Sequence, residues 1–148
     1  MVIFYRRKLE VLHDRAGTKK CIVVFNARRI EPTIINKGAL AIRIVSCEAV
    51  LNIVIEADNT NEHAYLMGIV YHDVPEEKFD AVYKILNECN ERYDHIKFVL
   101  DTKSKVIRAI SDNVIQLDSC GAVCYELMYR MMCIVRAAYP VIKNVIQV

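Results

Sequence analysis

The sequence is poor in proline and glycine, with three and four residues, and it has no long apolar run. The longest uninterrupted apolar stretch, residues 64–71, is far shorter than the roughly 20 residues that a helix needs to span a bilayer. At the start of the chain, Arg6, Arg7 and Lys8 follow the first apolar residues, which is the wrong order for a secretory signal. We therefore expect a soluble, unexported protein of the cytoplasm.

Catalytic signatures are also missing, and none of the six cysteines forms a Cys-x-x-Cys pair. In a domain with its own core, such cysteines are small buried hydrophobes of a reducing compartment. Cys120 and Cys124 lie four residues apart, a spacing that can hold a metal or present paired thiols on one side of a helix. Two ligands are too few for a metal site, so we favour buried packing. We expect no enzymatic activity, no cofactor and no metal.

What the chain does have is a globular composition, with 54% hydrophobic and 26% charged residues over 148 positions. This length fits one domain with a single core, residues 1–148, in which residues 1–17 could form a loosely attached arm. Little glycine and proline leaves no room for a long flexible linker.

The charges are unevenly distributed. Residues 1–43 hold ten Lys and Arg against three acids, whereas residues 44–148 hold ten against fifteen. The basic third could meet nucleic acid, an anionic membrane or the acidic remainder of the same protein. We favour the intramolecular contact or a dimer contact, because we expect Arg28 and Arg29 on a helix surface.

Large apolar residues alternate with smaller or more polar ones in two segments, residues 40–44 and 51–56. A third segment, residues 63–72, is mostly apolar throughout. These patterns predict three strands, and their short links favour an antiparallel meander with a polar turn at residues 58–61. Residues 18–30 suit either a helix capped by Thr18 or a strand through Cys-Ile-Val-Val-Phe.

Pro75 predicts the start of a helix, because proline is favoured at a first helical position and acids follow it at residues 76 and 77. Residues 96–100 and 106–110 predict two strands joined by a polar hairpin loop. Asp118 or Ser119 should cap a final helix that Pro140 ends or kinks. The expected order is (α)βββαββα, an α+β fold with an antiparallel sheet of about five strands and helices packed on it.

Several short segments together resemble the YbjN family of proposed bacterial sensory transduction regulators. They are Val-Pro-Glu-Glu-Lys-Phe at 74–79, Leu-Asn-Glu-Cys-Asn at 86–90, Ile-Lys-Phe at 96–98 and Ala-Tyr-Pro at 138–140. The resemblance covers residues 38–142, is strongest after Val74, and is weak in the first 37 residues. It favours a helix in residues 18–30. It implies a fold like that of type III secretion chaperones, small dimeric proteins that hold other polypeptides, and no catalytic residues.

Two apolar groups could form a partner or dimer surface. The predicted strand around residue 68 is apolar on both faces, and methionines cluster on the last helix, where they repack readily against a partner. The candidate residues are Tyr65, Met67, Ile69, Tyr71, Met128 and Met132. Filling of the core is the commoner role of such methionines.

We therefore expect a chaperone-like or adaptor-like protein-binding module that forms a homodimer and binds an unidentified polypeptide. A regulatory role is compatible with this expectation. The alternative is a regulator whose basic amino-terminal third contacts nucleic acid. A third hypothesis, an enzyme built on the carboxylates Asp73, Glu76, Glu77 and Asp80, needs a pocket beside them. Acids at a helix start are ordinary, since they complement the helix dipole.

Overall fold

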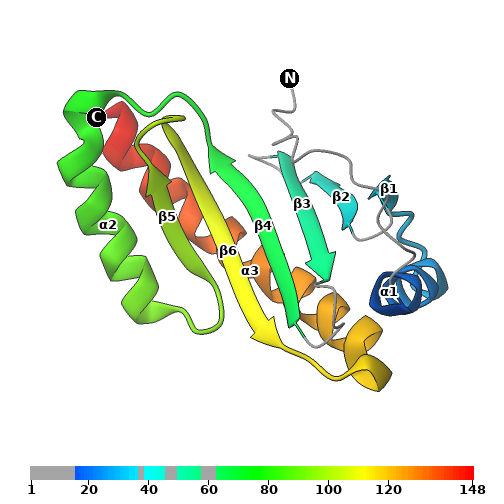
Figure 1. Ribbon diagram of the computed structural model, residues 1–148. Coiled ribbons are helices and arrows are strands. Elements are labelled where there is room, and N and C mark those ends of the chain that lie inside the picture. The colour runs from blue at the N-terminus through cyan, green and yellow to red at the C-terminus, as the bar shows by residue number, and fades with distance from the viewer. Residues whose placement is uncertain (1–15, 37–38, 46–49, 58–62) are drawn as a thin grey trace.

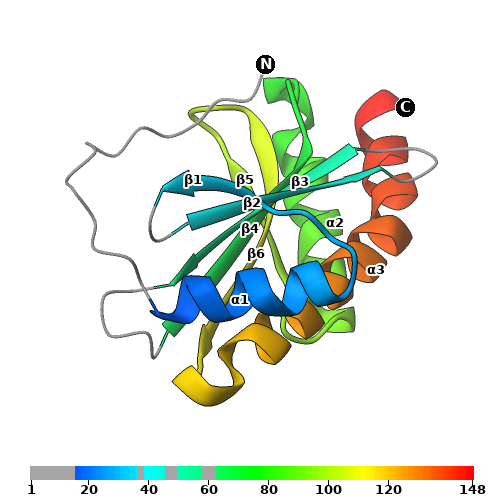
Figure 2. The ribbon, with the colours of Figure 1, turned by 90° about the vertical axis from the view of Figure 1, so that its right-hand side faces the viewer.

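An antiparallel sheet of six strands forms the centre of the structure, and helices cover one of its faces (Figures 1 and 2). The computed structural model describes residues 16–36, 39–45, 50–57 and 63–148. The elements are α1 (Ala16–Ala27), β1 (Thr33–Asn36), β2 (Ala39–Val45), β3 (Val50–Ala57), β4 (His63–Tyr71), the 3-10 turn η1 (Glu76–Lys78), α2 (Phe79–Arg92), β5 (Lys97–Asp101), β6 (Val106–Val114), the 3-10 turn η2 (Leu117–Ser119) and α3 (Cys120–Gln147). The strand order in space is β1-β2-β3-β4-β6-β5.

The expected α+β class and antiparallel sheet are confirmed, with one strand more than the five expected. The additional strand, β1, has only four residues, too few to show an alternating pattern in the sequence. It pairs with β2 and so extends the predicted meander. The predicted polar turn at 58–61, Cys47 and residues 1–15 of the arm lie outside the described residues.

One face of the sheet is buried under the helices. On β3, Leu51, Ile53 and Ile55 are buried, and on β4 every second residue is buried, as the two-residue period of a strand requires. The strand register pairs Ile53 with Gly68 and Ile55 with Leu66, so these residues share one face. Figure 2 shows α2 and α3 on this side of the sheet.

The predicted helix in residues 18–30 is confirmed as α1, but α1 begins at Ala16 and ends at Ala27, so Thr18 lies inside the helix and does not cap it. Arg28 and Arg29 therefore follow the helix instead of lying on its surface, and Arg29 has a positive φ of 60°. α1 packs on the first half of α3, where the rings of Phe25 and Tyr125 have centroids 6.0 Å apart. Phe25 is fully buried at this contact.

The helix that Pro75 predicts is confirmed, but Pro75 itself is extended and lies one position before η1. Its acids Glu76 and Glu77 occupy the first turn as expected. α2 then buries Val82, Leu86 and Cys89, which are spaced three and four residues apart. This spacing turns one stripe of the helix towards the core.

The start of α3 is at one of the two predicted caps, but the cap hydrogen bond is not made. Ser119 occupies the N-cap position with helical backbone angles and no side-chain cap hydrogen bond, and Asp118, one residue earlier, pairs with Lys20 at 3.4 Å. The helix does not end at Pro140 but continues to Gln147, because Ile142 and Ile146 bury their side chains beyond the proline. Within the described residues, no helix is long and apolar enough to cross a membrane.

Candidate functional site

The face of the sheet that points away from α2 and α3 carries a row of apolar side chains. The register places Val54, Met67 and Ile110 side by side across β3, β4 and β6, and all three are half-buried. Tyr65 and Ile69 lie on the same face, two residues before and after Met67. None of these five is among the described residues that pack against the buried core. We call these five residues the helix-free face.

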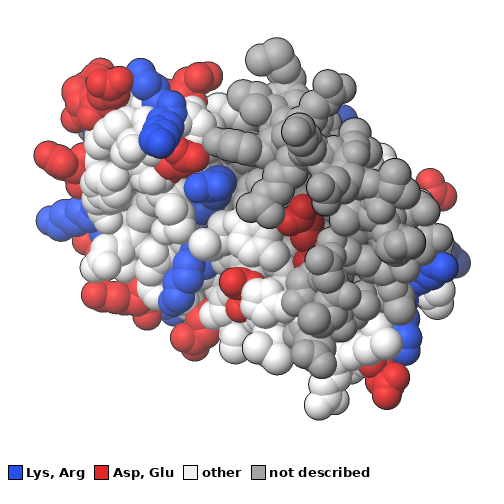
Figure 3. Space-filling model, in the orientation of Figure 1, with Lys and Arg blue, Asp and Glu red and all other residues white. Residues whose placement is uncertain are grey.

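Charged residues border the helix-free face. The register places Glu56 and Asp112 on either side of Tyr65, and Arg108 beside Ile69. Arg108 forms an ion pair with Asp101, with 3.5 Å between Nη2 and Oδ2. Its Nε is buried and has no hydrogen-bond acceptor among the described residues. Figure 3 shows this side of the molecule, with uncharged side chains between separate basic and acidic ones.

The hydroxyl of Tyr65 is a neutral hydrogen-bond donor at this border. Burial raises its pKa above the ordinary value; the positive charge of Arg108 opposes the shift, and the negative charges of Asp112 and Glu56 add to it. This hydroxyl offers a neutral donor to a carbonyl-rich partner. The helix-free face therefore combines apolar contact area with polar groups at its edge.

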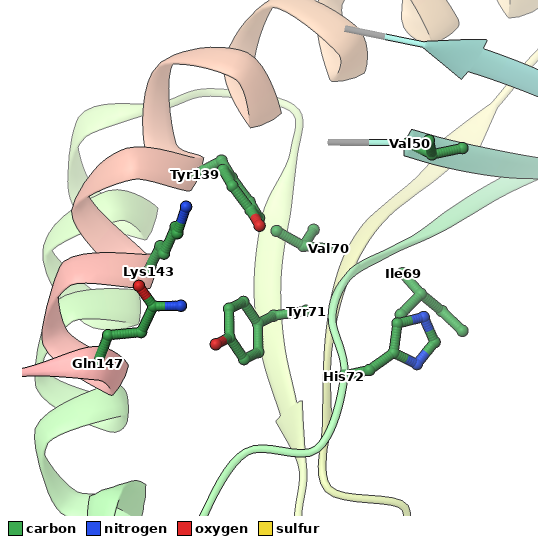
Figure 4. Close-up of a pocket in the computed structure, with 8 residues that line it drawn as sticks. All are labelled: Val50, Ile69, Val70, Tyr71, His72, Tyr139, Lys143 and Gln147. Carbon is green, nitrogen blue, oxygen red and sulfur yellow. The ribbon is translucent and has the colours of Figure 1, made fainter. Parts of the chain in front are cut away.

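Tyr71 does not belong to this face, although the sequence grouped it with the other three residues of β4. The strand register shifts between Ile69 and Tyr71, and this bulge turns Tyr71 towards α3. Its ring lies 6.3 Å from that of Tyr139, centroid to centroid. Figure 4 shows the two tyrosines at a hollow whose lining also includes the polar ends of His72, Lys143 and Gln147.

The two methionines of the candidate surface lie on α3, on the other side of the sheet. Met128 retains 2% of its accessible surface and belongs to the hydrophobic core. Met132 is half-buried. The structure thus brings together Tyr65, Met67 and Ile69 but separates them from both methionines, and Met128 fills the core.

The acidic group at the start of α2 is not enclosed. Asp73, Glu76, Glu77 and Asp80 are all exposed, and Glu76 pairs with Lys105 at 2.8 Å. The hydrogen bond and charge of Lys105 lower the pKa of Glu76. These carboxylates therefore face solvent, and the hollow described above is lined by other residues.

Two described cations of the basic third, Lys20 and Arg28, have partners within the chain. Lys20 pairs with Asp118, and the guanidinium of Arg28 lies 4.1 Å from the centroid of the Tyr125 ring. These contacts support the intramolecular interpretation of the charge imbalance. A contact with nucleic acid stays a prediction, which steep loss of binding with rising salt would test.

The structure also adds a third cysteine to the predicted pair. Cys21 of α1 meets Cys120 and Cys124 of α3, and the three sulfur atoms lie within 4.8 Å of one another. All three side chains are buried and none forms a disulfide. The three cysteines are buried in the core, as expected for small hydrophobic residues. Three neighbouring sulfur atoms are also a ligand set that soft metal ions accept.

Sequence reasoning missed Val54 and Ile110 on the helix-free face. A signal for Val54 was present, because it is an apolar residue on the otherwise polar face formed by Asn52 and Glu56. Nothing in the sequence shows that Ile110 lies beside Met67, since that contact depends on β6 pairing with β4. Likewise, the meeting of Cys21 with the α3 cysteines depends on tertiary packing.

The same fold occurs in solved structures of two complexes. A chain of the HopA1–SchA chaperone–effector complex aligns with a TM-score of 0.56 and 11% identity, over 84% of this chain and 94% of its own. A chain of the ExoU–SpcU complex from the type III secretion system of Pseudomonas aeruginosa aligns with a TM-score of 0.52 and 12% identity, over 84% and 95%. The fold is therefore of the type III secretion chaperone kind.

YbjN from E. coli, described as a proposed transcription regulator, shares the same fold. It aligns with a TM-score of 0.58 and 11% identity, over 88% of this chain and 94% of its own. No family model and no curated protein sequence matches the chain. At such low identity the likeness establishes the architecture, and what the chain binds has to be argued from its own surface.

Proposed function

We propose that this chain is a non-enzymatic, chaperone-like or adaptor-like protein that binds an extended segment of another polypeptide on its helix-free face. The observation that carries the proposal is the row formed by Val54, Met67 and Ile110. These side chains are in register, only half-buried, and not used by the core. The structural neighbours SchA and SpcU, which occur in complexes with effectors, support a role of this kind.

The chemistry of the face suits an extended peptide. Apolar side chains of a bound segment would cover the row, and this contact would remove nonpolar area from water. At the edge, the hydroxyl of the half-buried Tyr65 can donate a hydrogen bond to a peptide carbonyl.

Site-specific photo-crosslinking tests the proposal directly. A photoreactive amino acid is placed at position 67 in one protein and at the exposed position of Tyr83, on α2, in a control protein. In lysate of the source cell, we expect polypeptide adducts from position 67 and few or none from position 83. Equal labelling at both positions, or adducts at position 83 alone, would contradict the proposed surface.

A charge substitution separates binding from folding. Met67→Glu, in a protein without the photoreactive amino acid, should reduce binding of the polypeptide that crosslinking identified at least tenfold. The reason is the large free-energy cost of removing a carboxylate from water in the apolar row. The free energy of unfolding should change by about 1 kcal/mol or less, since Met67 does not pack in the core. The expected homodimer and the cytoplasmic location stay predictions, and the sedimentation mass of the wild-type protein tests the dimer.

A further inference from the structure

Three cysteines from two helices form a sulfur cluster in the core. The sulfur atoms of Cys21 and Cys120 are 3.8 Å apart, and all three, including that of Cys124, lie within 4.8 Å of one another. Their side chains retain only 0–2% of their accessible surface. No disulfide joins the three cysteines, and the 3.8 Å between Cys21 and Cys120 is well above the roughly 2.0 Å of an S–S bond.

Gly121 explains why the cluster can form. A Cβ atom at this position would lie 2.6 Å from the carbonyl oxygen of Lys20 and 2.6 Å from Cγ2 of Val24. Because glycine lacks that atom, α1 approaches α3 closely at the residue next to Cys120. Cys124 lies one turn further along α3 and so faces α1 on the same side.

The three thiols of the cluster interact with one another through hydrogen bonds. Hydrogen bonds from Cys124 and Cys21, with the nearby charge of Lys20, lower the pKa of Cys120 to about 4. The hydrogen bond with Cys120 raises the pKa of Cys21 to about 12, and it also raises that of Cys124. Cys120 is the first residue of the 28-residue helix α3, whose amino-terminal dipole favours a negative charge.

The sulfur spacing fits a metal–thiolate centre. With metal–sulfur bonds of about 2.3 Å, two sulfurs on one ion lie roughly 3.8 Å apart in a tetrahedral site and roughly 4.0 Å apart in a trigonal one. The observed 3.8 Å between Cys21 and Cys120 is within this range. Among the described residues, no histidine or carboxylate lies with the three sulfur atoms. Zinc in structural sites takes four ligands, whereas sulfur-only ligation also suits Cu(I).

We propose that Cys21, Cys120 and Cys124 form a three-sulfur site for a soft monovalent ion, Cu(I), which joins α1 to α3. Each thiol that binds the ion as a thiolate releases one proton to solvent. The residual negative charge lies beside Lys20 and the start of α3. The inference is independent of the proposed polypeptide binding, because the cluster is on the helical side of the sheet.

Anaerobic titration of the reduced, full-length protein with Cu(I), in competition with a chromophoric Cu(I) chelator, tests the site. We expect one equivalent to bind, and we expect X-ray absorption of the wild-type complex to show sulfur ligands only, at about 2.3 Å. Bound ion should raise the melting temperature, because it binds the folded state and connects two helices.

Single substitutions locate the ligands. Cys21→Ala, Cys120→Ala and Cys124→Ala should each weaken Cu(I) binding at least tenfold. Cys133→Ala, on the exposed side of the same helix, Cys89→Ala on α2 and Cys47→Ala should leave the affinity unchanged. Circular dichroism shows whether each variant is folded.

Two measurements on the wild-type protein decide the question even if a variant does not fold. Nitrogen or oxygen ligands in the X-ray absorption spectrum, or no Cu(I) bound in competition with the chelator, would overturn the proposal. Binding of Zn(II) in preference to Cu(I) would overturn it too, because a four-coordinate ion needs a ligand that the cluster does not supply. Unchanged affinity in all three cluster variants would show that the ion binds elsewhere.

Discussion

Asn90 of α2 and Phe98 of β5 exchange two hydrogen bonds. The amide N–H of Phe98 donates to Oδ1 of Asn90 at 2.7 Å, and Nδ2 of Asn90 donates to the carbonyl oxygen of Phe98 at 3.0 Å. β5 is an edge strand, whose outer backbone groups could otherwise pair with another chain. A single side chain thus satisfies the backbone near the start of one sheet edge and attaches α2 to it.

Asn90→Ala should lower the free energy of unfolding by about 1–3 kcal/mol, because two part-buried backbone groups lose their partners. Urea denaturation followed by circular dichroism measures the change. Asn87→Ala is the matched control on the same helix, since the hydrogen bond of Asn87 to Glu91 is exposed. Its effect should be about 0.5 kcal/mol or less. Equal losses in both variants would contradict the role of Asn90.

Gly121 and Gly68 both lie where an added Cβ would be too close to a neighbour, but the neighbours differ. At Gly121 the Cβ would meet the backbone oxygen of Lys20 at 2.6 Å, which cannot move without shifting α1. At Gly68 it would meet Cδ1 of Leu51 at 2.7 Å, the far end of a flexible side chain. We therefore expect different costs for the same substitution.

Gly121→Ala should destabilise the protein by about 1–3 kcal/mol through overpacking. Alanine in a helix would by itself stabilise α3 by up to about 1 kcal/mol, so a net loss identifies the close helix contact. Gly68→Ala should change stability by less than about 1 kcal/mol, because Leu51 can rotate. Thermal and urea unfolding measure both variants, and a stabilised Gly121→Ala protein would show that α1 and α3 are not in close contact there.

Elements with a local sequence pattern were predicted, whereas elements that depend on contacts between distant residues were not. The sequence predicted α2 and the hairpin of β5 and β6 because periodicity and turn residues are local, and it missed β1 because four residues show no period. The end of β6 was missed as well, since Ser111 and Asp112 are polar and pair with β4 only through tertiary contact.

The candidate surface was only partly predictable, for the same reason. Alternation correctly places Tyr65, Met67 and Ile69 on one face of β4, but it would place Tyr71 there too. The bulge that turns Tyr71 towards Tyr139 was missed, although Gly68, one residue before the shifted segment, is a weak signal for it, because an isolated glycine in a strand often marks a bulge. Cys21 could not be assigned to the α3 cysteines without knowing that α1 and α3 touch.

Asp101 should make the stability of the β5–β6 hairpin depend on pH. Its carboxylate accepts hydrogen bonds from the backbone N–H groups of Ser104 and Lys103, at 3.3 and 3.0 Å, and lies near Arg108. These interactions lower its pKa in the folded state. A lowered folded pKa contributes stability above the unfolded pKa, and that contribution is lost as the pH falls through the folded pKa.

Asp101→Asn should therefore be less stable than the wild type above about pH 5, and the difference should shrink below about pH 4 as the wild-type carboxylate takes up a proton. Urea midpoints of both proteins from pH 2 to about pH 7 measure this. A difference that stays constant over the whole range would show that the charge of Asp101 contributes nothing to folding.

Ile142 and Val141 test whether α3 continues beyond Pro140. Ile142 is fully buried, whereas its neighbour Val141 is 49% exposed. Ile142→Ala should lower the free energy of unfolding by about 2–5 kcal/mol, because it leaves a cavity under the sheet. Val141→Ala should change it by about 0.5 kcal/mol or less. If the helix ended at the proline, the two adjacent substitutions would have similar, small effects in urea unfolding. A large difference between them therefore requires a helical turn after Pro140 that holds Ile142 in the core.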